Sequence, residues 1–216
     1  GLFRYFGSIF ATFSPFLTYG SFNLECNTVL AVTERWVSEV VIGLNLCPFA
    51  RRELVSGRIR FVATDANSEE ALLIALQEEL THLNQHPEVE TTLLVHPEVL
   101  TDFMAYNDFL AAAEGLIEYL ELDGIYQLAS FHPDYQFGGT QPDDAENYTN
   151  RSPYPMLHLL REDSLERAIA SYPGTESIPE RNIELMNRLG VEHMRRIGKL
   201  LWSKNRTSES VSLSKR

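Results

Sequence analysis

Residues 91–98, with the sequence TTLLVHPE, contain the clearest strand signal of the chain. An unbroken run of β-branched and aliphatic residues is typical of a strand buried on both faces, and the proline ends it. A second His-Pro-acid triplet, His132-Pro133-Asp134, follows another predicted strand at 125–131. If the two strands run parallel, His96 and His132 lie at the same carboxyl edge of the sheet, where open α/β sheets bind ligands.

Predicted helices and strands alternate on both sides of residues 91–98. Apolar residues recur at helical spacing from Val29 to Leu44, and Pro48 is predicted to end that helix. The remaining predicted elements are a strand at 58–64, a helix capped by Asn67 and Glu70 with an apolar face of Leu72, Leu73, Leu76, Leu80 and Leu83, and a helix at 101–121 capped by Thr101.

This order predicts an α/β fold with a small, parallel, three-stranded sheet covered by helices. Residues 132–155 show neither helical nor alternating periodicity, which predicts a long ordered polar loop after the third strand. Helices are predicted again at 156–171 and 178–202. The alternative is a ferredoxin-like α+β sheet, with a fourth strand within 132–156.

The two ends of the chain differ from its middle in composition. Residues 1–24 are rich in aromatic residues and carry a single charge, Arg4, so we expect a leader or extension outside the domain. Residues 25–202 are expected to form one globular domain. Ser203 to Arg216 is rich in Ser, Lys and Arg, and is predicted to be a disordered tail.

The charge balance excludes several classes of function. The 216 residues have a formal net charge of -12, so nucleic acids and anionic membranes are not expected partners. The first lysine is Lys199, which excludes Schiff-base chemistry and a phosphate-binding loop lysine from most of the chain. Two cysteines, Cys26 and Cys47, form no disulfide framework and suit a reducing compartment such as the cytoplasm.

The long loop contains the candidate catalytic residues. His132 is the expected general acid or base, and Asp134 is expected to orient it. Arg151 is expected to bind a small anion together with His158 and Arg161, which lie three residues apart and so share a face of the predicted helix. Further candidate binding residues are His96, Tyr135, Asn147 and Asn150.

Two other kinds of site remain open. Cys47 is a candidate nucleophile at the predicted end of the first helix, where the helix dipole does not activate a thiol. A metal site could use His96, His132, Asp134 and His158, although no HExxH motif or paired CxxC motif is present. The sequence identifies neither a metal nor any other cofactor.

Three stretches carry a resemblance to a known family: residues 41–50 (VIGLNLCPFA), residues 91–97 (TTLLVHP) and residues 130–161. They resemble, in order and spacing, the bacterial proteins grouped as domain-of-unknown-function family 1415. The resemblance extends from about Thr28 to Trp202. It implies no activity or cofactor, and it groups Cys47, His132, Asp134, Tyr135, Asn147, Asn150, Arg151 and His158 as one motif set without roles.

The leading hypothesis is an enzyme that acts on a small anionic molecule by acid–base chemistry at His132. The alternatives are a non-catalytic binding or assembly module, anchored by tyrosines of the long loop, and a metal-dependent enzyme. Convergence of Cys47, His96, His132 and Arg151 on one pocket would favour the enzyme, whereas side chains that point separately into core and solvent would favour the module.

Overall fold

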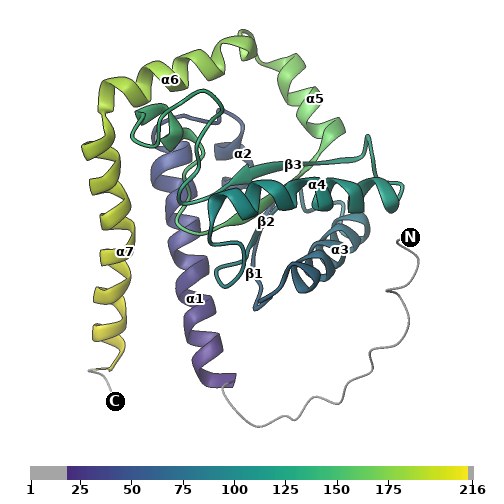
Figure 1. Cartoon of the computed structure of the whole chain (residues 1–216), viewed down its shortest axis with the longest axis horizontal. Coiled ribbons are helices and arrows are strands. Elements are labelled where there is room, and N and C mark those ends of the chain that lie inside the picture. Colours follow the sequence, from purple (N-terminus) through teal and green to yellow (C-terminus); the bar gives the residue numbers. More distant parts are fainter. Residues whose placement is uncertain (1–18, 214–216) are drawn as a thin grey trace.

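The computed structural model describes the backbone of residues 19–213 and the side chains of residues 26–203. It contains a four-stranded mixed sheet surrounded by helices (Figure 1). In chain order the elements are α1 (Tyr19–Trp36), the π-helix η1 (Val37–Ile42), α2 (Ala50–Val55), β1 (Ile59–Ala63), α3 (Glu69–Gln85), β2 (Thr91–Val95), α4 (Phe103–Tyr119), β3 (Tyr126–Phe131), the 3-10 helix η2 (Ala145–Thr149), β4 (Met156–Arg161), α5 (Glu162–Ser171), the 3-10 helix η3 (Thr175–Ser177), α6 (Ile178–Leu189) and α7 (Val191–Leu213).

The strand order is β1-β2-β4-β3. β1 and β2 are parallel, and β4 is antiparallel to both β2 and β3. Because β4 runs against both of its neighbours, the three strands predicted from the sequence all point the same way. The shared carboxyl edge is therefore confirmed, and His96 and His132 each follow a strand that ends there.

The predicted helix at 156–171 is wrong over its first six residues, which form β4. This central strand is covered on both faces: Leu157 and Leu159 pack on one side, and Met156 packs on the other. A strand buried on both faces reads as a nearly continuous apolar run, which periodicity does not distinguish from a buried helix. The sheet is consequently mixed and four-stranded rather than parallel and three-stranded.

The ferredoxin-like alternative also differs from the structure. That fold has the element order β-α-β-β-α-β, whereas here β3 and β4 follow two β-α units. The fourth strand lies at the end of the long loop and not within it.

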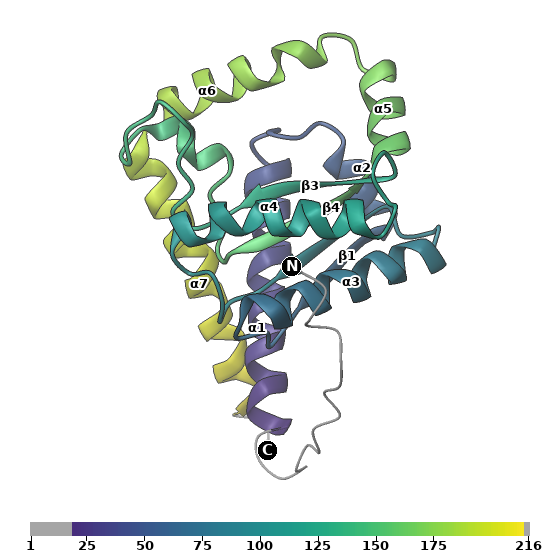
Figure 2. The ribbon, with the colours of Figure 1, turned by 45° about the vertical axis from the view of Figure 1, so that its right-hand side comes forward.

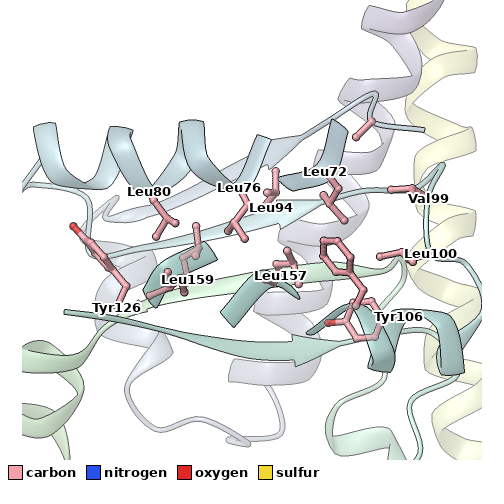
Figure 3. Packing of buried hydrophobic residues seen from close by; sticks show 14 of the residues in the cluster. Leu72, Leu76, Leu80, Leu94, Val99, Leu100, Tyr106, Tyr126, Leu157 and Leu159 are labelled. Atoms are coloured by element: carbon pink, nitrogen blue, oxygen red, sulfur yellow. The ribbon is translucent and has the colours of Figure 1, made fainter. Parts of the chain in front are cut away.

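Two layers of helices cover the sheet. In Figure 2, α3 and α4 lie in front of the strands and α1 lies behind them. The front layer buries the predicted leucine face of α3 against the sheet, as Figure 3 shows for Leu72, Leu76 and Leu80 beside Leu94 and Leu157. The rear layer packs η1 and α1 residues against the other face of the sheet, including Trp36, whose ring lies 5.2 Å from that of Phe131.

Three predicted helix boundaries are corrected. Ser68, and not Asn67, caps α3 by accepting a hydrogen bond from the Ala71 amide. Asp102, and not Thr101, caps α4. The first helical run ends at Ile42, before Pro48, because the chain turns through Asn45 in the left-handed region with φ 53°.

The C-terminal helices surround the rear side of the fold. In Figure 1, α5 and α6 arch over the sheet, and α7 returns alongside α1. α7 extends into the segment 203–216 that the sequence predicts as a disordered tail. The predicted leader overlaps α1 from Tyr19 onward, and residues 1–18 lie outside the described residues. Among the described helices, none is both long enough and apolar enough to cross a membrane.

Candidate functional site

A cavity of about 270 Å³ lies on the rear face of the sheet, between β2, β4 and the helices η1, α2 and α5. Its wall is mainly aliphatic and aromatic, which is typical of small-molecule sites. The apolar lining residues are Trp36, Val37, Val41, Phe49, Ala50, Ile59, Leu93, Phe131, Leu160, Leu165 and Ala168.

The three stretches that carry the family resemblance meet at this cavity. The first contributes Cys47 and its neighbours, the second contributes Thr91 and Leu93, and the third contributes Phe131 and His158. These stretches lie far apart in the sequence, and the sheet brings them together. α5 closes the remaining side with Leu165 and Ala168, directly after β4.

His158 is the polar residue of the cavity wall with the most defined chemistry. The Thr91 hydroxyl donates to the Leu159 carbonyl over 2.5 Å, so it accepts a hydrogen bond from Nε2 of His158 over 2.7 Å. This arrangement leaves the lone pair on Nδ1. Burial lowers the pKa of His158 to about 4, which keeps the ring neutral at physiological pH.

Cys47 lies in the short connection between η1 and α2, as a free and partly buried thiol. Two contacts from α6 hold this connection: Asn182 donates to the Leu46 carbonyl over 2.9 Å, and Arg181 donates to the Asn45 carbonyl over 3.1 Å. The helix that was expected to end at Cys47 ends five residues earlier, at Ile42, so the thiol is not part of a helix terminus.

Four charged residues border the cavity, and their charges cancel: Arg52, Arg161, Glu53 and Glu90. Glu53 is buried, and its carboxylate accepts from Nε of Arg52 and Nε of Arg58, each over 2.8 Å. Arg52 is exposed, and among the described contacts its guanidinium donates only from Nε. The wall carries no excess charge, and of its two arginines Arg52 has more donors without a described partner than Arg161.

His96 and His132 lie on the opposite side of the sheet from His158. Both are buried against Tyr106, with ring centroids 5.9 Å and 5.1 Å from it. His132 donates from Nε2 to the Leu100 carbonyl and accepts at Nδ1 from the Asp134 amide, so both of its nitrogens are used. Burial lowers the pKa of His132, and it lowers that of His96 to about 4.

Asp134 orients His132 through its backbone amide, while its carboxylate is exposed. His96 donates from Nδ1 to the Val99 carbonyl, and its Nε2 is buried without a partner. These contacts hold Leu100 in the left-handed region, with φ 56°. The pair of histidines thus fixes the turn at the sheet edge and is closed to solvent.

The predicted binding residues of the long loop hold the loop itself. Asn147 is fully buried, accepts from the Phe137 amide and the Thr140 hydroxyl, and donates to the Gln141 carbonyl. Asn150 donates to the Ser130 carbonyl.

Two more loop residues that were expected to bind a ligand make contacts within the loop. Arg151 donates to the carbonyls of Tyr135 and Pro142 and lies over the Tyr148 ring, 4.7 Å from its centroid. The Tyr135 ring packs between Phe103 and Phe137. This loop is a folded unit with few polar groups left for a ligand.

Arg161 and His158 do not share a face, because residues three apart on a strand point to opposite sides of the sheet. The Arg161 guanidinium donates to the carbonyls of Leu83, His86 and Val89 and to the Tyr126 hydroxyl. It ties β4 to the end of α3. The shared helical face from which their pairing was predicted is wrong, because both residues lie on the strand β4.

The four residues whose convergence would favour an enzyme do not meet, so by this criterion the binding or assembly module is favoured over an enzyme at the sheet edge. The cavity is lined by Cys47 but not by His96, His132 or Arg151. Cys47 and His158 both line it, together with Trp36, Phe131 and Leu165, which no sequence signal separates from ordinary core residues. Within the described part of the chain, no group of three His, Cys, Asp or Glu side chains could hold a metal ion.

Comparison with known proteins identifies a family. The family model described as "Protein of unknown function (DUF1415)" matches residues 28–196, which include every segment that lines the cavity. No curated protein and no solved structure matches the chain significantly.

Proposed function

Since the chain belongs to the DUF1415 family, and since the three stretches that carry the resemblance line one cavity, we propose that this cavity is the substrate site of a small-molecule enzyme. The observation that supports it most is a neutral imidazole, His158, held in one tautomer by Thr91 inside an apolar wall. A fixed tautomer in the wall of an apolar cavity suits proton transfer to or from a bound molecule.

The proposed substrate has an apolar body that fills the cavity. At about 270 Å³ the space is close to the lower limit for ligand pockets, so the molecule is small. An anionic group on it would meet Arg52 at the cavity border, where the guanidinium has donors to spare. This keeps the small anionic ligand and the His158 contact expected from the sequence, with Arg52 in place of Arg151 as the proposed anion-binding residue.

His132 is a less suitable acid–base group than His158. Its two nitrogens already bind the Leu100 carbonyl and the Asp134 amide, so a proton transfer would break a buried hydrogen bond. A non-catalytic binding protein would use the same cavity. Turnover of a bound molecule, lost when His158 is replaced, would distinguish an enzyme from such a binding protein.

Two free thiols and a net charge of -12 support a reducing compartment and argue against nucleic-acid partners.

Titration with octanoate and octan-1-ol, followed by NMR of backbone amides, tests the proposal. We expect both to shift the amides of Cys47, His158 and Leu165, and we expect octanoate to bind about tenfold more tightly because of Arg52. Arg52→Met should remove that difference and leave octan-1-ol binding unchanged, whereas Arg51→Met, on the same exposed helix, should change neither. Shifts spread over the surface, or no saturable shifts, would contradict the proposal.

A further inference from the structure

We propose that His82 and His86, at the C-terminal end of α3, form a surface binding site for one divalent transition-metal ion. The two histidines are four residues apart in the sequence, so both lie on the same face of the helix. Their rings stack with 4.0 Å between the centroids and 23° between the planes. α3 covers the front face of the sheet, away from the cavity behind it, so this site does not depend on the proposed substrate site (Figure 2).

Glu88 holds the His86 ring in one orientation. Its carboxylate accepts a hydrogen bond from Nδ1 of His86 over 2.8 Å. The pKa of Glu88 is lowered by its own backbone amide and by His86, so the carboxylate stays ionised at neutral pH. Since Nδ1 carries the proton, Nε2 is the nitrogen left to bind a metal. A carboxylate on the outer nitrogen is the usual second partner of a metal-binding histidine, because it fixes the ring and makes it a more basic ligand.

His82 supplies the second nitrogen. Burial lowers the pKa of His82, and the nearby charges of Arg60 and His86 lower it further. Its ring is therefore neutral at pH 7 and can coordinate a metal without first losing a proton. On a tetrahedral ion, with each nitrogen about 2.0–2.1 Å from the metal, two ligands lie about 3.3 Å from each other. The two rings already stack near that separation, so small changes in side-chain torsions would bring both nitrogens onto one ion.

The backbone that carries the two histidines is anchored. The Arg161 guanidinium donates to the Leu83 carbonyl over 2.7 Å and to the His86 carbonyl over 3.1 Å. The His86 amide also donates to the His82 carbonyl over 2.9 Å. These contacts hold the two side chains at a fixed spacing before a ligand binds, which lowers the entropy cost of binding.

The donor atoms, rather than the net charge, select the ion. Arg60 and Glu79 offset each other through two hydrogen bonds, over 2.8 Å and 3.1 Å. Imidazole nitrogens suit Zn²⁺, Ni²⁺ and Cu²⁺, whereas Mg²⁺ and Ca²⁺ prefer oxygen ligands. The described part of the chain contains no group of three His, Cys, Asp or Glu side chains that could hold a metal, so water completes the coordination here. The site therefore suits an exchangeable ion rather than a closed structural centre.

Calorimetric titration of the full chain with ZnCl₂, NiCl₂ and MgCl₂ tests the site. We expect one Zn²⁺ or Ni²⁺ ion to bind per chain and Mg²⁺ not to bind. His82→Asn and His86→Asn should each weaken zinc binding at least about tenfold, whereas His193→Asn, on α7, should leave it unchanged. Absence of saturable zinc binding, or equal zinc affinity in the folded His82→Asn and His86→Asn variants, would overturn the proposal. His82→Gln and His86→Gln replace these variants if they do not fold.

Glu88 has a separate test, because it acts through His86. Glu88→Gln should weaken zinc binding about 10–100-fold and leave the free energy of unfolding without metal unchanged. Glu70→Gln, exposed at the other end of α3, is the matched control and should change neither quantity. Zinc should also raise the urea midpoint of the wild type, because the ion binds the folded chain, and it should not raise that of the variant lacking both histidines. Equal stabilisation of that variant would show that the ion is held elsewhere.

Discussion

Thr91 and His158 are joined across neighbouring strands, with 2.7 Å between the threonine Oγ1 and Nε2 of the ring. The same hydroxyl donates to the Leu159 carbonyl, so it must accept from the imidazole. A strand-to-strand contact in the sheet thereby determines which ring nitrogen carries the proton and which carries the lone pair. The tautomer of the proposed acid–base group is thus a consequence of the β2–β4 register.

Thr91→Val should destabilise the protein by about 1–3 kcal/mol, because it leaves a buried N–H and a buried carbonyl without their partner. It should also shift His158 toward the other tautomer, which ¹⁵N NMR of the ring reports directly. Thr81→Val is the matched control, since that hydroxyl lies exposed on α3 and bonds only the Gln77 carbonyl. An unchanged tautomer in Thr91→Val would contradict the role given to this threonine.

Gly43→Ala should disrupt the turn that precedes Cys47, because the added Cβ would meet the Glu39 carbonyl oxygen at 2.1 Å. We expect the free energy of unfolding, measured with urea, to fall by about 3 kcal/mol. Gly115→Ala, within α4 and with open space around its Cβ position, should instead raise stability by about 0.5–1 kcal/mol. Similar effects of the two substitutions would refute the account of this turn.

Asn147→Ala should loosen the long loop. It removes three hydrogen bonds within a buried site, and the groups left unpaired cost about 2–4 kcal/mol in total. Hydrogen exchange of the Phe137 amide should accelerate, while that of the β2 amides should change little. Asn107→Ala, on the exposed side of α4, is the control. Protection of the Phe137 amide equal to that of the wild type would show that another contact holds the loop.

Stability should fall as the pH drops from about 6.5 to about 4, and His96 contributes to this fall. Its pKa is about 4 in the folded protein and near 6.5 when unfolded, so the unfolded chain binds the proton first in this window. The contribution is complete above pH 6.5, and about 3 kcal/mol of it disappears by pH 4. Urea unfolding at several pH values measures it.

His96→Gln should flatten that pH dependence, although the variant is less stable at neutral pH. The carboxylates of the chain also titrate in this range, so the difference between wild type and variant is the relevant quantity. His193→Gln, on α7, serves as control. An equally steep pH dependence in His96→Gln would mean that His96 is not a source of the acid sensitivity.

The sequence predicts much of the sheet, because local patterns determine it. The runs at Ile59–Ala63, Thr91–Val95 and Tyr126–Phe131 are short, β-rich and bounded by breaking residues, so their strands are found where expected. β4 was missed because both of its faces are buried, and its Met-Leu-His-Leu-Leu run carries no alternation of polarity. Because β4 is not predicted, its two antiparallel pairings, which make the sheet mixed, are not predicted either.

The candidate site was predicted in part. Cys47 and His158 are identified by their residue types, but their place in one cavity wall depends on β4 being a strand, which periodicity does not indicate. His132 and Arg151 attracted attention because polar residues in a long loop are often functional. Here their hydrogen bonds are used to fold the loop, and only the tertiary contacts distinguish that role from ligand binding.

The central claim is tested most directly by octanoate binding to a variant in which a larger side chain fills the cavity. Ala168 lines the cavity from α5, while Ala170, two residues away on the same helix, is exposed and does not. We predict that Ala168→Phe weakens octanoate binding at least about tenfold by calorimetric titration, and that Ala170→Phe leaves it unchanged. Equal binding by both folded variants would contradict the assignment of the cavity as the substrate site.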